Sequence, residues 1–268
     1  MALTFDVYRP AVPNGAAVIF VNSGGFVSGQ IRQCEAVGWG EYRFVPPAEL
    51  HLEGQTERIP LLAQFSFAPL LEAGFTLFDV RHAWGPGFPL PEIVADIRDA
   101  VRFIHANAVE LRVDPDRIGL WGASAGGYLA LHAAFANEEP AAGVEGLTAG
   151  TGRARSVAVY YPAGYDLAGD TERFPELIAE LPALQVDAAV LDSLSLRHTL
   201  SPDDPPCLIV YGAEDFPFIT EPSESVCVGL TRLGVECRRI AIPGTGHEFR
   251  GPDGYRPEAG GQASQAGV

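Results

Sequence analysis

Short apolar runs alternate with helical patterns along most of this chain. The runs are rich in β-branched and aromatic residues and have the length of buried strands. They are Ala17–Val21, Phe75–Val80, Ile118–Trp121, Val157–Tyr161, Cys207–Tyr211 and a last one at Val235–Ile242. Helical patterns occur at Leu61–Glu72, Pro91–Asn107, Ala125–Ala136 and Pro222–Leu233. This alternation predicts an α/β fold with a mostly parallel central sheet flanked by helices on both faces.

Two long segments interrupt the alternation. Residues 30–59 and 163–201 are each too long for a simple connection in a compact domain. We interpret them as lid or cap segments, and packing insertions at the periphery are the alternative. With 268 residues, the chain fits a single domain over residues 1–250. Residues 251–268 have no apolar period and predict a flexible tail.

The charge balance is strongly acidic. The chain has 18 basic and 34 acidic residues and a formal net charge of −16, which argues against nucleic acid as a partner. The same field favours neutral or cationic substrates over anionic ones. No apolar run approaches the length of a membrane span, and the N-terminus has no features of a signal peptide. We expect a cytoplasmic protein without membrane contact.

The four cysteines are Cys34, Cys207, Cys227 and Cys237, at irregular spacing and without a Cys-x-x-Cys pair. This spacing favours buried free thiols over a metal site. In an exported protein, Cys227 and Cys237 would be the pair to suspect.

A serine stands between two glycines where a predicted strand meets a predicted helix. The segment reads Gly122-Ala-Ser124-Ala-Gly126, which is the nucleophile-elbow pattern G-x-S-x-G. The turn holds the serine in a strained backbone conformation above the sheet, and only small neighbours avoid collision there. We therefore predict that Ser124 is a nucleophile.

A serine nucleophile needs a base, and the chain has six histidines. His247 follows the last predicted strand in the glycine-containing loop Pro243-Gly-Thr-Gly-His247, which can direct an imidazole back over the sheet. The other five are His51, His82, His105, His132 and His198. The chain order serine, acid, histidine favours His247 as the base.

The base in turn needs an acid that fixes its tautomer. Asp215 lies just beyond the strand Cys207–Tyr211 in the segment Gly212-Ala-Glu214-Asp215. We predict Asp215 as this acid, with the adjacent Glu214 as the alternative.

Backbone amides must also stabilise the oxyanion of an acyl-transfer reaction. Gly24 and Gly25 follow the strand Ala17–Val21, and Ala125 follows the nucleophile; we predict that these three residues form the oxyanion hole. Candidate substrate-binding residues lie at strand ends or in the predicted cap. They are Asn22, Ser23, Phe26, Tyr161, Phe216 and Phe218, with Trp84 and Tyr165 as further aromatic candidates. Core packing is the alternative role for the aromatic ones.

Taken in this order, the four motifs resemble the α/β-hydrolase superfamily, over roughly Val18 to Phe249. The resemblance is to its esterase and lipase branch, which includes hormone-sensitive-lipase-like carboxylesterases, feruloyl or acetylxylan esterases and kynurenine formamidases. One motif departs from the pattern. Asn22-Ser23-Gly24-Gly25 stands where that branch usually has His-Gly-Gly.

The residues and the resemblance together predict a serine esterase that forms an acyl-enzyme and needs no metal or organic cofactor. The expected partner is a small-molecule ester, and self-association into a homo-oligomer is left open. An amide-cleaving relative, such as a formamidase or a peptidase, is the alternative. A ligand-binding module without catalysis is a third hypothesis.

Overall fold

A central sheet organises the computed structural model, which describes residues 4–26, 32–37, 41–45, 67–83, 87–135, 153–251 and 254–255. Within these ranges the sheet has seven strands in the order β1-β5-β2-β6-β7-β8-β9. Their bounds are β1 Thr4–Tyr8, β2 Ala17–Val21, β5 Thr76–Arg81, β6 Ile118–Ala123, β7 Val157–Tyr160, β8 Cys207–Gly212 and β9 Cys237–Ile242. All neighbours are parallel except β1, which is antiparallel to β5. The prediction of a mostly parallel sheet is confirmed.

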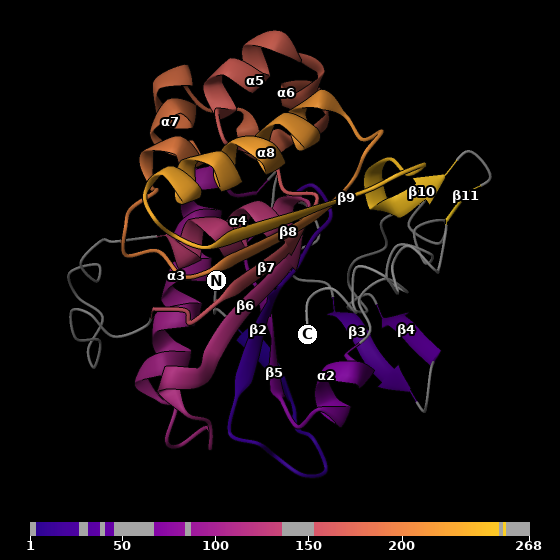
Figure 1. Ribbon diagram of the computed structural model, residues 1–268, viewed down its shortest axis with the longest axis vertical. Helices are drawn as coiled ribbons and strands as arrows, with labels where there is room; N and C mark the ends of the chain where they lie inside the picture. The colour runs from indigo at the N-terminus through magenta and orange to yellow at the C-terminus, as the bar shows by residue number, and fades with distance from the viewer. Residues whose placement is uncertain are drawn as a thin grey trace.

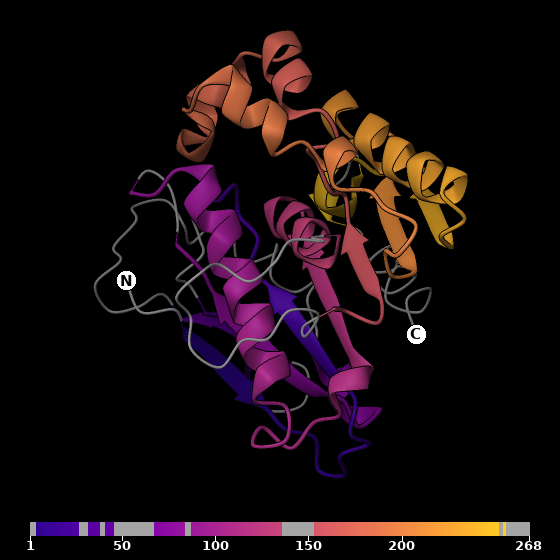
Figure 2. The ribbon, with the colours of Figure 1, turned by 90° about the vertical axis from the view of Figure 1, so that its left-hand side faces the viewer.

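Helices pack on both sides of this sheet. They are α2 Ala68–Glu72, α3 Leu90–Ala106, α4 Ala125–Ala134 and α8 Pro217–Arg232. In Figures 1 and 2, α3 and α4 lie together on one side of the sheet, and α2 lies on the other. Helix α3 buries the periodic face that its sequence predicts, including Ile93, Ile97 and Ile104. Burial of such a face, at about 25 cal/mol per Å², fixes the helix on the sheet.

Residues 163–201, which we call the cap segment, fold into short helices. They are α5 Leu167–Arg173, α6 Glu176–Glu180, the 3₁₀ turn η3 Pro182–Leu184, α7 Ala188–Ser193 and the 3₁₀ turn η4 Leu196–His198. Figure 1 shows them at the same end of the molecule as α8. On α4, the Tyr128 hydroxyl donates to the Leu194 carbonyl at 2.9 Å, and His132 Nε2 lies 3.1 Å from the same oxygen. These contacts tie the cap segment to the helix that follows Ser124.

Two small antiparallel pairs lie outside the main sheet. One joins β3 Arg32–Val37 to β4 Glu41–Val45, and the other joins β10 Arg250–Gly251 to β11 Gly254–Tyr255. The pair β3–β4 belongs to the predicted lid segment 30–59. The rest of that segment and nearly all of the predicted tail 251–268 lie outside the described residues.

Two elements differ from the sequence prediction. Strand β1 was not predicted, because its short Thr-Phe-Asp-Val-Tyr run has only a weak strand pattern. The strand is stabilised by its pairing with β5. Helix α8 begins at Pro217, not at Pro222, which lies inside the helix. Because proline donates no backbone hydrogen bond, both Pro217 and Pro222 are suitable as the first residue of a helix. In the structure the helix begins at Pro217.

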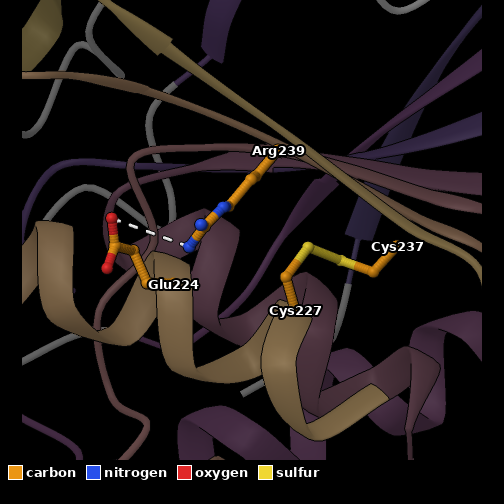
Figure 3. Close-up of a disulfide and its surroundings, with 4 residues drawn as sticks. All are labelled: Glu224, Cys227, Cys237 and Arg239. Atoms are coloured by element: carbon orange, nitrogen blue, oxygen red, sulfur yellow. Dashed lines mark ion pairs between the residues drawn. A yellow bond between two sulfur atoms is a disulfide. The ribbon is translucent and has the colours of Figure 1, made fainter. Parts of the chain in front are cut away.

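The prediction of free thiols is wrong for Cys227 and Cys237, which form a disulfide between α8 and β9 (Figure 3). Their Cα atoms are 5.2 Å apart, a separation that a disulfide spans readily. The sequence named this pair as the one to suspect in an exported protein, but it could not establish the geometry, which depends on how α8 lies across β9. An ion pair between Glu224 and Arg239, with 3.6 Å between N and O, joins the same two elements. Cys207 is buried and free, as predicted.

We expect loss of this disulfide to destabilise the α8–β9 unit. The cysteines are 10 residues apart, and closing a loop of that length stabilises a fold by roughly 2 to 3 kcal/mol in the chain-entropy model. A Cys227→Ala, Cys237→Ala double variant should therefore unfold at lower urea concentration than the parent. Cys207→Ala, which removes a thiol outside the disulfide, controls for thiol loss alone. If a reductant lowers the parent's midpoint but leaves the double variant unchanged, the effect belongs to this bond.

Candidate active site

Ser124 lies at the turn between β6 and α4, in the backbone conformation that the elbow pattern predicts. Its φ is 50° and its ψ is −123°, a sparsely populated conformation for a residue with a side chain. A Cβ at Gly122 would lie 2.4 Å from the Gly126 carbonyl oxygen, and one at Gly126 would lie 2.4 Å from the carbonyl oxygens of Val21 and Asn22. The two glycines are therefore required for the close approach of backbone around the serine.

The three residues predicted to act together are in contact. Ser124 Oγ lies 3.2 Å from His247 Nε2. On the other side of the ring, His247 Nδ1 lies 3.1 Å and 3.0 Å from the two carboxylate oxygens of Asp215. The Asp215 side chain is fully buried, whereas a quarter of the His247 side chain is exposed. A buried carboxylate against Nδ1 leaves Nε2 free to accept the serine proton.

Asp215 and His247 come from loops at the ends of neighbouring strands. Asp215 follows β8 and His247 follows β9, and these strands pair in parallel. The Glu214 side chain, the alternative acid, instead accepts a hydrogen bond from the Gly244 amide at 3.1 Å. The Asp215 amide donates to Gly212 O, and its carboxylate accepts from the Phe216 amide at 2.7 Å. Glu214 thus stabilises the loop that carries His247, whereas Asp215 contacts the imidazole ring.

The other described histidines have different surroundings. Burial lowers the pKa of His105 to about 4, and burial with nearby Arg98 lowers that of His132 to about 4. Burial also lowers the pKa of His82. His198 is half exposed and lies 3.5 Å from Asp192. His51 lies outside the described residues. Of the described histidines, only His247 lines the cavity that contains Ser124.

The predicted oxyanion-hole residues surround the same cavity. Gly24 and Gly25 follow β2 with positive φ values of 99° and 63°, and Ala125 is the first residue of α4. All three line the cavity beside Ser124. The positive φ values favour glycine at both positions. The first amides of α4 add the positive end of its dipole.

Comparisons with known proteins find relatives with esterase names. The family model BD-FAE matches residues 53–160. Esterase LipQ of Mycobacterium tuberculosis is 24% identical over 187 residues, which cover 67% of this chain but only 44% of LipQ. Ethyl acetate hydrolase of Pseudomonas putida is 26% identical over 260 residues, covering 92% of this chain and 71% of that protein.

Solved structures extend the likeness to the whole chain. The apo form of Thermogutta terrifontis esterase 2 superposes with a TM-score of 0.71 at 18% identity, covering 100% of this chain and 88% of that one. Its propionate-bound form gives 0.67 at 19% identity, covering 99% and 89%. The chain has the α/β-hydrolase fold. The relatives it matches carry esterase names, and the match to LipQ spans less than half of that protein.

The cavity beside Ser124 has a volume of about 850 Å³. Five of the six candidate substrate-binding residues line it: Ser23, Phe26, Tyr161, Phe216 and Phe218. Asn22 differs, because it is fully buried and is not among the lining residues. Trp84 lies outside the described residues. The Tyr161 ring packs against the His247 ring, with centroids 4.7 Å apart, and so supports the imidazole.

Sequence reasoning missed the cap-segment residues that line this cavity. They are Leu167, Asp170, Thr171, Leu177, Leu181 and Leu184. Their pattern in the sequence does not indicate that they line one cavity, because they lie on separate short helices that are brought together only by tertiary packing. The length of the segment was the only available signal.

Within the described residues, no group of three or more His, Cys, Asp or Glu side chains is placed to hold a metal ion. In the same part of the chain, no helix is long and apolar enough to cross a membrane.

Proposed function

We propose that this protein is a serine hydrolase that cleaves a carboxylic ester through an acyl-enzyme intermediate. The observation that carries the proposal is the continuous chain of contacts from Asp215 through His247 to Ser124 Oγ, which opens into a lined cavity. The esterase names of the relatives support ester over amide as the substrate.

The geometry supports a two-step acyl transfer. His247 Nε2 takes the Ser124 proton as Oγ bonds to the ester carbonyl carbon, and the carbonyl oxygen becomes an oxyanion facing the amides of Gly24, Gly25 and Ala125. His247 then donates that proton to the leaving alkoxide as the carbon–oxygen bond breaks. Water, deprotonated by the same imidazole, attacks the acyl-enzyme and releases the acid and Ser124. Asp215 holds the His247 ring and stabilises the imidazolium.

We further propose that residues 1–250 act as one catalytic domain, with the cap segment as the wall that selects substrates. Leu177, Leu181 and Leu184 line the same cavity as Ser124, which supports this role. This apolar wall suits the hydrocarbon part of a small or medium ester.

The compartment is a separate proposal. The sequence favours the cytoplasm, but the Cys227–Cys237 disulfide is a bond that oxidising compartments maintain. We propose that the protein works where this bond stays oxidised. Thiol alkylation of the protein taken from its native cells, without prior reduction, would label Cys227 and Cys237 if the proposal is wrong.

A substrate panel tests the proposed function. We expect hydrolysis of p-nitrophenyl esters, measured from acetate to laurate, and much slower hydrolysis of N-formylkynurenine, because an ester loses a better leaving group than an amide. Selective turnover of the formamide would replace the esterase proposal with the amidase one.

A covalent probe separates an enzyme from a ligand-binding module. Thermogutta terrifontis esterase 2 is phosphorylated by paraoxon. We expect paraoxon to add one diethyl phosphate to this protein, with loss of p-nitrophenolate, and intact mass to show no addition in Ser124→Ala. Absence of labelling in the parent protein, together with silence on every ester, would favour the ligand-binding hypothesis.

A further inference from the structure

The wall that the cap segment contributes to the cavity is apolar except at one carboxylate. Leu167, Leu177, Leu181 and Leu184 form its hydrocarbon surface. Asp170 and Thr171 on α5 interrupt it, and the Thr171 hydroxyl is occupied with the carbonyls of its own helix. A buried carboxylate in an apolar wall is costly unless something pairs with it.

One oxygen of Asp170 has no such pairing within the described part of the chain. The residue is only 7% exposed, it lines the cavity, and its Oδ2 is buried without a hydrogen-bond partner among the described residues. No other described residue of the cap segment combines burial, charge and contact with the cavity in this way.

The two nearby guanidinium groups are engaged elsewhere. Arg173 donates to both carboxylate oxygens of Glu221 at 2.7 and 3.0 Å. Arg197 bridges Asp166 and Asp192. Two other carboxylates and two guanidinium groups act electrostatically on Asp170: Asp166, Glu221, Arg173 and Arg197. With its own carboxylate ionised, the local balance is therefore negative, as is the whole chain at −16. A bound cation would be favoured here.

An aromatic face is available in the same cavity. Phe218 lines it and is held between two rings, stacked on Phe216 at 5.1 Å and edge-to-face with Phe174 at 5.5 Å between centroids. Aromatic faces attract cations through the ring quadrupole. A carboxylate oxygen without a hydrogen-bond partner among the described residues and an aromatic ring in the same pocket are two elements that recognise an alkylammonium group.

We propose that Asp170 determines substrate specificity, by accepting a hydrogen bond from a protonated amine carried by the ester substrate. This inference rests on the proposed function and names the substrate class of the same site. Asp170 binds the remote end of the substrate, and Ser124 attacks its carbonyl.

The protonation of Asp170 gives the inference a pH signature. Burial, and secondarily the neighbouring Asp166, raise the pKa of this carboxyl to about 6; Glu221 acts in the same direction, and Arg173 and Arg197 oppose the shift. The carboxylate is charged above that pH and neutral below it. The preference for a cationic ester should therefore be full at pH 8 and decline as the pH falls through about 6.

The free energy of unfolding should change with pH in the direction opposite to the substrate preference. Because the folded state raises the pKa of Asp170, it binds more protons than the unfolded chain between the two pKa values, and stability falls as pH rises through that window. Asp170→Asn should therefore raise the melting temperature at pH 8 and leave it nearly unchanged near pH 4. A buried charge that lowers the stability of the fold is expected at a ligand-binding site and not at a position that serves only packing.

An isosteric pair of substrates tests the inference. In 3-(dimethylamino)propyl butyrate a protonated nitrogen replaces the branching carbon of 4-methylpentyl butyrate, so the two esters differ in charge but hardly in shape. A second pair, methyl 5-(dimethylamino)pentanoate and methyl 6-methylheptanoate, places the same change on the acyl side. The ratio of kcat/KM within a pair cancels any effect of pH on the catalytic step, because that effect is common to both esters.

We expect the parent enzyme to prefer the ammonium ester of at least one pair, and Asp170→Asn to reduce that preference by roughly tenfold or more, the value of one charge-assisted hydrogen bond. Glu172→Gln is the matched control, since Glu172 lies on the same helix, is exposed and does not line the cavity. Turnover of the hydrocarbon ester should persist in both variants and reports an intact site. If Asp170→Asn does not fold, Asp170→Ser replaces it.

A preference that is the same in the parent, Asp170→Asn and Glu172→Gln would overturn the inference, and so would a parent that favours the hydrocarbon member of both pairs. Binding of the free alcohols, 3-(dimethylamino)propan-1-ol and 4-methylpentan-1-ol, needs no turnover and is measured by thermal shift. Stronger stabilisation by the amine that disappears in Asp170→Asn supports the site even if no ester is hydrolysed. Equal binding of the two alcohols by a protein without ester turnover contradicts both proposals.

Discussion

Replacing Ser124 with alanine is expected to lower kcat for every ester by about 10⁶-fold, the loss seen when a serine nucleophile is removed from a complete triad. The substitution removes only Oγ, which lies 3.2 Å from His247 Nε2. Alanine retains the Cβ, so the strained φ of 50° is no worse than in the parent. Circular dichroism and the melting temperature should therefore change little while turnover disappears.

A matched hydroxyl deletion shows that the effect belongs to this position. Ser223 on α8 is fully buried, and its Oγ has no hydrogen-bond partner among the described residues. Ser223→Ala should keep the parent kcat. Unchanged turnover in Ser124→Ala, or an equal loss in Ser223→Ala, would show that the nucleophile has been assigned to the wrong residue.

The arrangement around Ser124 was predictable because it is encoded locally. The strand β6, the glycines at 122 and 126 and the helix α4 are contiguous in the chain, and steric exclusion at the two glycines dictates the turn. The positions of Asp215 and His247 follow from strand ends in a parallel sheet, whose carboxyl termini gather at one edge. Their catalytic roles remain predictions that the substitutions test.

The cavity wall and the disulfide were not predictable in the same way. Asp170 gives no sequence signal, because its exposure to the cavity depends on how α5 packs beside α7 and α6. The link between Cys227 and Cys237 depends on the placement of α8 across β9. Both features are set by contacts between elements, for which periodicity and turn chemistry carry no information.

Asp215→Asn is expected to lower kcat by about 10⁴-fold with little change in the fold. The Asp215 side chain is fully buried against His247 Nδ1, with both oxygens within 3.1 Å of it. An asparagine can turn its NH₂ group toward Nδ1, which then must accept a hydrogen bond. In that tautomer Nε2 carries the ring proton, so Nε2 cannot accept the proton of Ser124.

Glu214→Gln is the control that decides between the two adjacent acids. Glutamine keeps the side-chain oxygen that accepts from the Gly244 amide, so the histidine loop should stay in place and kcat should remain within a few-fold of the parent. Measurement of kcat for both variants with one p-nitrophenyl ester separates the roles. A larger loss in Glu214→Gln than in Asp215→Asn would transfer the acid to Glu214. The expected order instead follows from burial, because only a carboxylate shielded from water stabilises the imidazolium strongly enough to account for a loss of this size.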